Sequence, residues 1–294
     1  MTSSAETRIA RRCICCGGTA LRRSPAILMP FVAARAFGWT PVEITADWGL
    51  KTIAPGMAYP LCNSVQCQDC GVLFLDIRFD EAEMAALYDD YRGPAYTAQR
   101  EAFEPGYAER NALILQGFGY IPQVEALLEP FVPPQPAVLD WGGDTGLNTP
   151  FAATARLRHV YDISARPMAP GVERVAREQL GDVAYDLVVC SNVLEHLPHP
   201  RRALAEIAAQ MRPTTLLYLE VPLEELVRTA EPGADLANRR KYWHEHVNFF
   251  TEASLRALLG PAGLDLVELQ VLRMEVRGVE GSVFALICRR RPDA

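Results

Sequence analysis

A glycine-rich stretch that directly follows a run of apolar residues limits most strongly what this chain can fold into. The apolar run ends at Asp140, and the six residues that follow it, Trp141 to Gly146, include three glycines. Glycine permits a positive φ and lets the backbone approach a ligand closely. We expect a buried strand, a tight loop and a helix from Leu147 to Ala155, with the free N–H groups of the helix facing the ligand.

A second acidic residue indicates the same fold. Asp162 follows the apolar run His159 to Tyr161 and lies 22 residues after Asp140. In a doubly wound α/β sheet, the acid at this spacing ends the second strand and binds the ribose of an adenosine cofactor. The pattern therefore predicts a cofactor site. Its expected residues in this part of the chain are Asp140, Gly142, Gly143, Gly146 and Asp162.

The alternation of elements from residue 137 onward favours a mostly parallel sheet with helices on both faces. Strands are predicted at 137–140, 158–162, 185–190, 215–221, 264–272 and 282–288, and helices at 200–210 and 251–260. The last two strands are close in sequence and predict an antiparallel terminal hairpin. The stretch between Asp162 and Asp186 is short, so we expect a trimmed set of elements there, with a short third strand at 172–175.

The glycine loop lacks the G-x-G-x-x-G spacing of dinucleotide sites, but it resembles the first motif of class I S-adenosylmethionine (SAM) methyltransferases. That motif reads roughly D-x-G-x-G-x-G. Asp140, Gly142 and Gly146 match it, whereas Asp144 stands in place of the middle glycine. The resemblance implies a Rossmann-like methyltransferase sheet with an antiparallel final strand, and SAM as the cofactor.

A second segment is similar to the same family. The residues 185–197 read YDLVVCSNVLEHL, and the fourth strand of the family commonly reads F-D-x-V and is followed by L-E-H. The resemblance implies that Ser191 and Asn192, at the end of this strand, contact the cofactor.

The eight cysteines of the chain include two C-x-x-C pairs, each followed by glycine. The pairs are Cys13 with Cys16 and Cys67 with Cys70. Two such turns direct four thiolates at one tetrahedral ion, which predicts a closed, structural Zn²⁺ site in a small N-terminal zinc-ribbon domain. Cys15 and Cys62 leave the choice of ligands open, and a redox pair or chance spacing are the alternatives.

We expect three regions along the chain: a zinc-binding domain at 1–79, a helical connecting segment at 80–131 and a SAM-binding methyltransferase domain at 132–294. Asp80 and Glu83 predict a capping box at the start of a helix in the connecting segment. A second helix is expected at 111–128. The proline-rich stretch 130–136 is the clearest boundary in the sequence.

Composition excludes several classes of partner. The formal net charge is −7, which disfavours broad binding to nucleic acid or to an anionic membrane. No apolar run approaches the ~20 residues that span a bilayer. The polar N-terminus, 1–12, has no apolar segment of the kind that directs secretion. The sequence therefore predicts a cytoplasmic protein that acts on a small molecule, and it does not predict the oligomeric state.

A segment rich in histidine and aromatic residues follows the predicted fifth strand. It runs from Lys241 to Thr251 and contains His244, Glu245 and His246 among four aromatic residues. Open α/β sheets bind ligands at the carboxyl ends of their strands, where this segment is expected. Histidine suits proton transfer near neutral pH, and the neighbouring aromatics are expected to stack on a sugar or base.

Together, these features resemble the sugar C-methyltransferases of deoxysugar pathways, which have two C-x-x-C pairs, a SAM domain and a Y-H-E-H segment. In that group a keto nucleotide-sugar loses a proton beside its carbonyl, and the enediolate takes the methyl group. The resemblance implies that His246, Glu245 and His244 act in acid–base catalysis, with His196 as a helper. The chain departs from the group in two ways: Trp243 replaces its tyrosine, and the sequence after the SAM domain is shorter. O-methylation of a related glycan precursor is therefore the alternative reaction.

Two other classes of function remain open at this point. One is an RNA methyltransferase with a zinc module, for which the weak cluster Arg11, Arg12, Arg22 and Arg23 is the only sign. The other is a non-catalytic interaction protein with a degenerate SAM fold, for which Asp144 in the glycine loop and the trimmed stretch after Asp162 are the best support.

Overall fold

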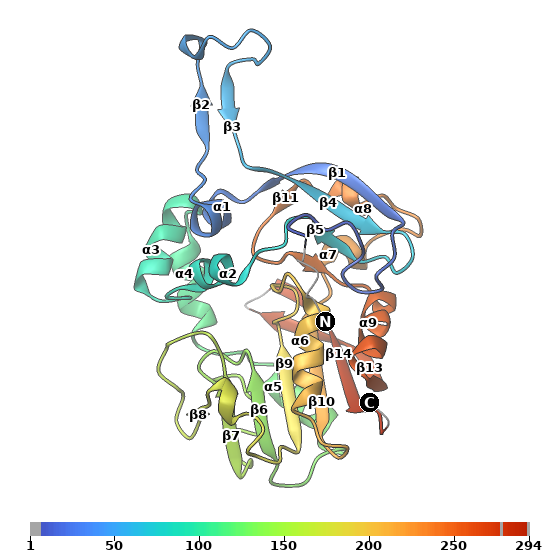
Figure 1. Cartoon of the computed structure of the whole chain (residues 1–294). Helices are drawn as coiled ribbons and strands as arrows, with labels where there is room; N and C mark the ends of the chain where they lie inside the picture. The colour runs from blue at the N-terminus through green and yellow to red at the C-terminus, as the bar shows by residue number, and fades with distance from the viewer. Residues whose placement is uncertain (1–6, 277–278, 293–294) are drawn as a thin grey trace.

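The computed structural model describes residues 7–276 and 279–292. Within these residues a large sheet and a smaller sheet lie one above the other, and a hairpin projects from the smaller one (Figure 1). The first six residues of the N-terminus, on which part of the secretion argument rests, lie outside the described residues. In the described part of the chain, no helix has the length and apolar character that crossing a bilayer requires.

The large sheet has seven strands in the order β13-β14-β10-β9-β6-β7-β8 within the described residues. Neighbours from β10 to β8 pair in parallel, and β14 is antiparallel to both of its neighbours. The predicted doubly wound, mostly parallel sheet with an antiparallel terminal strand is therefore confirmed. The strands are β6 (Ala137–Trp141), β7 (Leu157–Tyr161), β8 (Glu173–Arg174), β9 (Leu187–Ser191), β10 (Leu216–Pro222), β13 (Leu264–Val276) and β14 (Val279–Arg290).

The expected strands differ from the observed ones mainly at their ends. The third strand, expected at 172–175, is the two-residue β8, and only the 3-10 turn η2 (Arg177–Gln179) lies between it and β9. The tip of the expected terminal hairpin, 277–278, lies outside the described residues.

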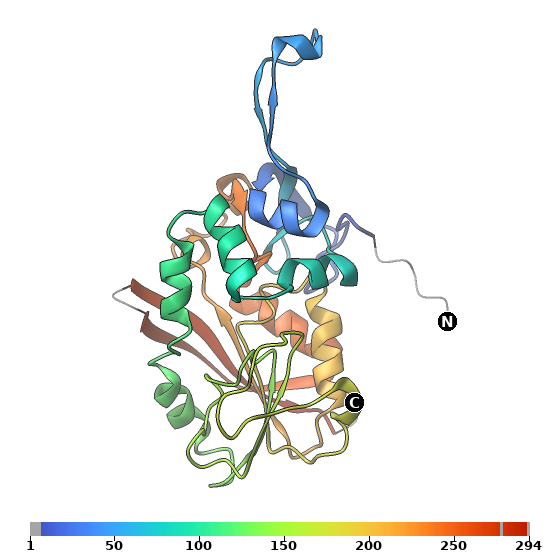
Figure 2. The same ribbon diagram turned by 90° about the vertical axis from the view of Figure 1, so that its left-hand side faces the viewer.

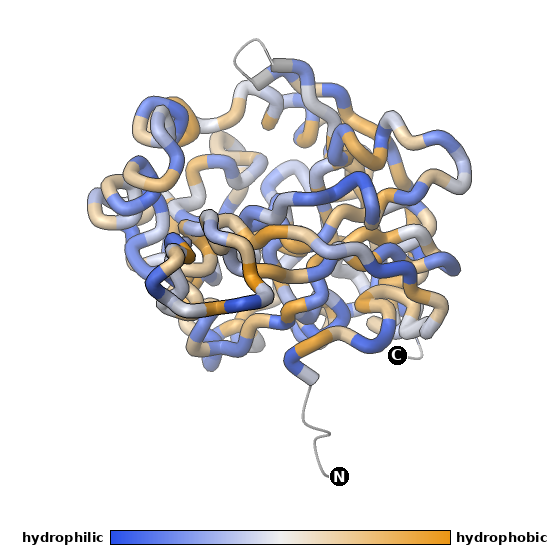
Figure 3. Tube along the Cα trace, turned by 90° about the horizontal axis from the view of Figure 1, so that it is seen from above, coloured by the Kyte–Doolittle hydropathy of each residue, from blue (hydrophilic) through white to orange (hydrophobic). Residues whose placement is uncertain are grey.

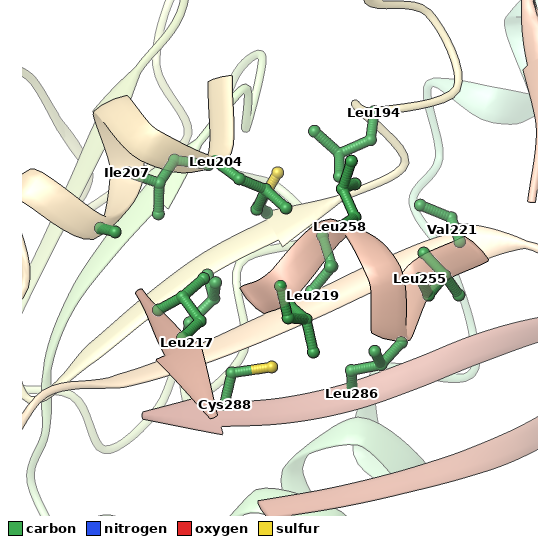
Figure 4. Packing of buried hydrophobic residues seen from close by; sticks show 14 of the residues in the cluster. Leu194, Leu204, Ile207, Leu217, Leu219, Val221, Leu255, Leu258, Leu286 and Cys288 are labelled. Atoms are coloured by element: carbon green, nitrogen blue, oxygen red, sulfur yellow. The ribbon is translucent and has the colours of Figure 1, made fainter. Parts of the chain in front are cut away.

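Alternating residues of β10 place the core on both faces of the large sheet. Leu217 and Leu219 pack on one face against α6 (Pro200–Ala209) and α9 (Glu252–Leu259), as Figure 4 shows. Leu216 and Tyr218 belong to the cluster on the other face, which includes residues of α5 (Ile121–Leu128). The helix α9 begins as predicted, because the Thr251 hydroxyl accepts the N–H of Ser254 at 3.1 Å.

The helix expected directly after the glycine loop, from Leu147 to Ala155, is absent, and this prediction was wrong. Turns alone connect β6 to β7. Pro150 has no N–H to donate and disfavours helical backbone in Thr149 before it. Phe151 takes a φ of +62°, outside the right-handed helical region. The cofactor loop is therefore followed by turns that lack the positive end of a helix dipole.

The connecting segment differs from the expectation in a similar way. The capping box of α2 (Glu81–Tyr88) is confirmed, with Asp80 Oδ1 accepting the Glu83 N–H at 2.9 Å. The single helix expected at 111–128 is two helices, α4 (Tyr107–Ile114) and α5, separated at Gly117, whose φ is +87°. The stretch before it, for which the sequence analysis predicted no element, contains α3 (Pro94–Phe103).

The smaller sheet joins distant parts of the chain. Its N-terminal strands are β1 (Leu21–Leu28), β4 (Leu61–Cys67) and β5 (Leu73–Leu75). The short strands β11 (Tyr242–Trp243) and β12 (Asn248–Phe249) complete it at its two edges, beside β1 and β5. The residues between β11 and β12 are those of the histidine-rich segment, so the N-terminal sheet holds this segment at both ends.

The remaining N-terminal elements complete the upper part of the molecule. Helix α1 (Pro30–Phe37) leads into the projecting hairpin of β2 (Val42–Ile44) and β3 (Gly56–Ala58), with η1 (Ala46–Trp48) between its strands (Figures 1 and 2). Seen from above, hydrophobic and hydrophilic residues are interspersed along the tube (Figure 3). The short elements α7 (Glu225–Arg228), α8 (Leu236–Arg239) and η3 (Gly260–Ala262) connect the later strands.

Candidate functional site

A cleft of about 560 Å³ lies at the carboxyl ends of the parallel strands. The glycine loop after β6, the end of β9 and the histidine-rich segment all line it. Arg92, which comes from the connecting segment, is also part of its wall. A smaller cavity of about 170 Å³ shares Gly142 and His196 with the cleft. The residues predicted for cofactor and for acid–base chemistry are thus neighbours.

The glycines of the loop are required by its backbone and by its surroundings. Gly142 and Gly146 have φ values of +80° and +74°, which side chains rarely tolerate. A Cβ at Gly142 would lie 2.5 Å from Val193, and one at Gly146 would lie 2.7 Å from Val172. Asp144, which departs from the glycine pattern, adopts the left-handed region as well, with φ +53°. Aspartate enters this region more readily than most residues, so the loop keeps a glycine-like path.

Charged groups fix the loop on both sides. The side chain of Asp144 pairs with Arg166 Nη1 at 2.5 Å, and its N–H donates to Asp162 Oδ2 at 2.8 Å. A Cβ at Gly143 would lie 2.5 Å from the carboxylate of Asp140, so the loop packs directly on this acid. Asp140 accepts the Thr149 hydroxyl at 2.6 Å, and burial raises the pKa of its carboxyl to about 7.

Asp162 lies at the end of β7, as the sequence predicted, and borders the smaller cavity. Its two oxygens accept the N–H groups of Asp144 and Ser164, the second at 2.6 Å. A carboxylate has about four acceptor positions, so two remain for ribose hydroxyls. The glycine cradle and this acid fit the adenosine and methionine portions of SAM.

Ser191 and Asn192, at the end of β9, bind a buried carboxylate that the sequence analysis missed. The Ser191 hydroxyl donates to Glu220 Oε1 at 2.7 Å, and the Asn192 amide donates to the same oxygen at 2.8 Å. Tyr120 and Tyr218 also donate their hydroxyls to Glu220. The sequence feature that could have revealed this buried carboxylate is a single glutamate within the otherwise apolar strand LLYLEVP.

Hydrogen bonds of Glu195 and Asn248 join the histidine-rich segment to the loop that follows β9, at the carboxyl ends of the parallel strands. The carbonyl of Glu195 accepts the N–H of Val247 at 2.7 Å, and the Asn248 amide donates to the carbonyls of Leu194 and Leu197. The L-E-H residues after β9 therefore lie beside His244 to His246.

His246 is oriented by Glu224, another residue missed by the sequence analysis. Its Nδ1 lies 2.7 Å from Glu224 Oε1. Because the carboxylate can only accept, Nδ1 carries a proton in this bond and Nε2 is the free nitrogen. Burial lowers the pKa of His246, but the bond to Glu224 and the nearby Glu195 outweigh burial and raise it above its usual value.

His244 and Glu245 have different surroundings. His244 Nδ1 accepts the N–H of His246 at 3.0 Å, and burial lowers its pKa to about 4. The Glu245 carboxylate binds Arg100 through two contacts of 2.6 and 3.1 Å. Burial raises the pKa of Glu245, but Arg100 and the two histidines outweigh it and hold the pKa at about 2. Glu245 is therefore a carboxylate that faces α3 through Arg100.

His196 completes the group. Its Nδ1 lies 3.1 Å from the carbonyl of Glu245 and 2.9 Å from the hydroxyl of Tyr88, and its ring centroid is 4.7 Å from that of His246. Burial lowers the pKa of His196 well below its usual value. The preceding residue, Glu195, is 1% exposed, and burial raises its pKa to about 8.

The aromatic residues of the segment do not face the cleft, so the expectation that they stack on a substrate was wrong. Trp243 is fully buried and donates its indole N–H to Ser64 at 2.8 Å in the N-terminal core. Phe249 and Phe250 are also buried. The cause is the pairing of β11 and β12 with the small sheet, which the sequence did not reveal. Tyr88, at the end of α2, and Tyr91 line cavities at the site instead.

The four predicted cysteines converge at the base of the N-terminal sheet. Cys13 Sγ lies 3.5 Å from Cys70 Sγ, and Cys16 Sγ lies 3.6 Å from Cys67 Sγ. All four sulfurs are within 4.8 Å of one another. A tetrahedral ion with bonds of ~2.3 Å needs sulfurs about 3.8 Å apart, which this cluster fits.

The two spare cysteines lie outside this cluster. Cys15 is buried, and burial raises the pKa of its thiol well above the usual value, so it remains a neutral thiol. Cys62 lies in β4 and packs in a separate hydrophobic cluster. Peptide N–H groups approach the sulfurs of Cys13 and Cys16 at 3.4 Å, as they do around thiolates.

The strand order is that of a doubly wound sheet with an antiparallel terminal strand, and the glycine loop after β6 and the acid after β7 lie where such sheets bind an adenosine cofactor. Residues 115–269, more than half of the chain, match the family model of the methyltransferase domain. The chain therefore belongs to the family of this methyltransferase domain.

Individual relatives are more distant. An uncharacterized protein of Synechococcus sp. is 30% identical over 184 residues, which are 54% of this chain and 42% of that protein. The chain thus spans less than half the length of this curated relative. Among solved structures, the 1,6-didemethyltoxoflavin-N1-methyltransferase of Burkholderia thailandensis is similar with a TM-score of 0.48 and 20% identity, covering 67% of this chain and 88% of that one. The magnesium protoporphyrin IX methyltransferase of Synechocystis PCC 6803 has a TM-score of 0.44 and 20% identity, covering 70% and 99%.

Proposed function

We propose that this protein transfers the methyl group of SAM to a nucleotide-linked sugar or a related glycan precursor, with His246 as the general base. The observation that carries the proposal is the pair of His246 and Glu224, which leaves Nε2 of the histidine free in a cleft that the glycine loop also lines. A histidine whose other nitrogen is held by a carboxylate has a defined tautomer and a defined direction.

SAM supplies an electrophilic methyl group when it is bound. The loop from Asp140 to Gly146 holds its methionine portion in this proposal, and Asp162 binds the ribose hydroxyls. Ser191 and Asn192, fixed by Glu220, line the part of the cleft between the loop and the histidines. Much of the acceleration then comes from aligning donor and acceptor.

The remaining chemical task is to remove a proton from the acceptor, either from a hydroxyl or from a carbon beside a carbonyl. His246 takes this proton at Nε2, and Glu224 stabilises the resulting imidazolium. His244 positions the backbone of His246, Glu245 positions the segment through Arg100, and His196 lies against the base. The sugar class rests on the resemblance of the combined motifs, and the polar walls at Arg92 and Glu245 support it.

The four-cysteine cluster holds one structural Zn²⁺ in this proposal. Its ligands are Cys13, Cys16, Cys67 and Cys70, and their sulfur separations support the assignment. A closed four-sulfur site has no position for a substrate, so the ion stabilises the N-terminal sheet. That sheet in turn holds both ends of the histidine-rich segment.

The experiment that tests the proposal is incubation of the protein with SAM and a panel of keto and hydroxy nucleotide-sugars, followed by mass spectrometry. We expect one methylated product, and we expect His246→Gln to lower turnover by ~10²–10⁴-fold while SAM affinity is kept. His159→Gln is the matched control, because His159 bonds Tyr185 and lines neither cavity of the site. A His246 variant with nearly full turnover would remove the residue from catalysis.

A further inference from the structure

Glu195 is a buried carboxyl group without hydrogen bonds. The residue is 1% exposed, and neither side-chain oxygen has a hydrogen-bond partner among the described residues. Buried polar groups are nearly always hydrogen-bonded, because leaving one unpaired costs free energy. Glu195 is among the residues that line the cleft of the proposed active site.

Two histidines lie beside this carboxyl group. His196 Nε2 is 3.8 Å from Glu195 Oε1. One ligand atom of each of Glu195, His196 and His246 lies within 4.8 Å of the other two. This group is separate from the four cysteines, which lie in the N-terminal module.

Both histidines use Nδ1 for hydrogen bonding, and in His196 the nitrogen nearer to Glu195 is Nε2. The carbonyl oxygen of Glu245 lies 3.1 Å from Nδ1 of His196. Because a carbonyl can only accept a hydrogen bond, Nδ1 carries the proton. Nδ1 of His246 likewise carries a proton, because it lies 2.7 Å from the carboxylate of Glu224. The Nε2 atoms then keep their lone pairs. Histidines that bind metals almost always donate their other N–H to a carboxylate or a carbonyl in this way.

We propose that Glu195, His196 and His246 bind one divalent transition-metal cation. Two imidazole nitrogens and one carboxylate on one side of an ion suit iron, manganese, cobalt, nickel or zinc, and they leave positions open toward the cleft. Bonds of ~2.0–2.2 Å need the ligand atoms to be about 3–4 Å apart. The Glu195–His196 pair, at 3.8 Å, already fits this range, and the upper limit of 4.8 Å for the group is close to it.

This inference rests on the proposed function for the identity of the acceptor, and it assigns His246 to the ion in place of direct proton transfer. The open positions suit an acceptor with two neighbouring oxygens, such as a diol or a hydroxyketone of a sugar. With a cation bound, His246 would serve as a ligand; an acceptor hydroxyl on the ion would lose its proton to water. The ion lowers the pKa of that hydroxyl, which direct proton transfer to Nε2 cannot do.

The test is titration of the full chain, with its cysteine site filled with zinc, by Co²⁺ and by Mn²⁺. We expect one saturable site in calorimetry, and cobalt absorption without the intense thiolate charge-transfer bands of a cysteine site. Glu195→Gln should abolish binding, and Glu224→Gln should weaken it by about 10–100-fold, because outer hydrogen bonds contribute on that scale. His196→Gln is the second ligand variant if Glu195→Gln does not fold, and His159→Gln is the control that should bind normally.

Two outcomes overturn the cation site. One is the absence of saturable cation binding to the unmodified protein. The other is that Glu195→Gln and His196→Gln bind the cation as tightly as the unmodified protein does. Activity separates this inference from the proposed function. If the enzyme treated with a chelator keeps its zinc and its turnover, whereas His246→Gln loses turnover, the base role stands and the cation site falls. If the cation binds at Glu195 but no nucleotide-sugar is methylated, the site is supported and the proposed acceptor class falls.

Discussion

Replacing Glu245 by glutamine should destabilise the fold by about 3 kcal/mol, because the change removes the more buried of the two carboxylates that pair with Arg100. The side chains of Arg100 and Glu245 are 9% and 13% exposed. Removing one partner of a buried pair typically costs about 3–5 kcal/mol. The pKa of Glu245 gives a similar magnitude, since a carboxyl whose pKa falls from 4.5 to about 2 on folding stabilises the folded state by about 3 kcal/mol at neutral pH.

The pH dependence of this contribution has a defined sign. The folded-state pKa lies below the unfolded value, so the stabilisation is fully present above pH 4.5 and is lost as the pH falls toward 2. Urea unfolding at pH 7 and at pH 4 gives the free energy of unfolding at each pH. We expect this free energy to fall from pH 7 to pH 4 in the unmodified protein, and to fall by less in Glu245→Gln.

A matched control uses the same arginine. Glu104 also pairs with Arg100, at 2.9 Å, but its side chain is 30% exposed. Glu104→Gln should cost less than about 1 kcal/mol, because exposed ion pairs contribute little. If the two glutamine variants lose equal stability, the argument that Glu245 anchors the histidine-rich segment through a buried ion pair is refuted.

Three further predictions concern cofactor, metal and base. Asp162→Ala should weaken binding of S-adenosylhomocysteine by ~1.5–3 kcal/mol in calorimetry, since ribose hydroxyls lose a charged acceptor; unchanged affinity would remove Asp162 from the site. Cys16→Ser should lower the zinc content below one ion per chain and increase proteolysis of the N-terminal module before that of the SAM domain, and retained zinc would contradict the ligand assignment. Glu224→Gln should move the acid limb of the pH–rate profile to lower pH, because Glu224 raises the pKa of His246; an unmoved limb would mean that another group titrates there.

The parts of the fold that depend on local sequence were predictable. The buried strands are short apolar runs, and the caps of α2 and α9 are made by residues three positions apart. The helix expected after the glycine loop was wrong because the glycine-loop pattern was given more weight than a local signal, Pro150, which was present in the sequence. The four cysteines were predictable as a cluster, because a C-x-x-C turn places its two thiols close enough to bind one ion.

The charged partners of the site were not predictable in the same way. Arg100 and Glu245 are 145 residues apart, and the pairing of His246 with Glu224 crosses 22 residues. The sequence placed His244, Glu245 and His246 at the correct edge, but it did not show that β11 and β12 join the N-terminal sheet. That pairing buries Trp243, which no periodicity in the segment indicates.

The most direct test of the proposed function is a methylation assay with SAM and with keto and hydroxy nucleotide-sugars. The unmodified protein and His246→Gln are assayed side by side. The account predicts that mass spectrometry detects a sugar carrying one additional methyl group with the unmodified protein, and about 10²–10⁴-fold less with the variant at equal SAM affinity. Equal product from both proteins, or a protein that binds SAM and methylates none of these sugars, would contradict it.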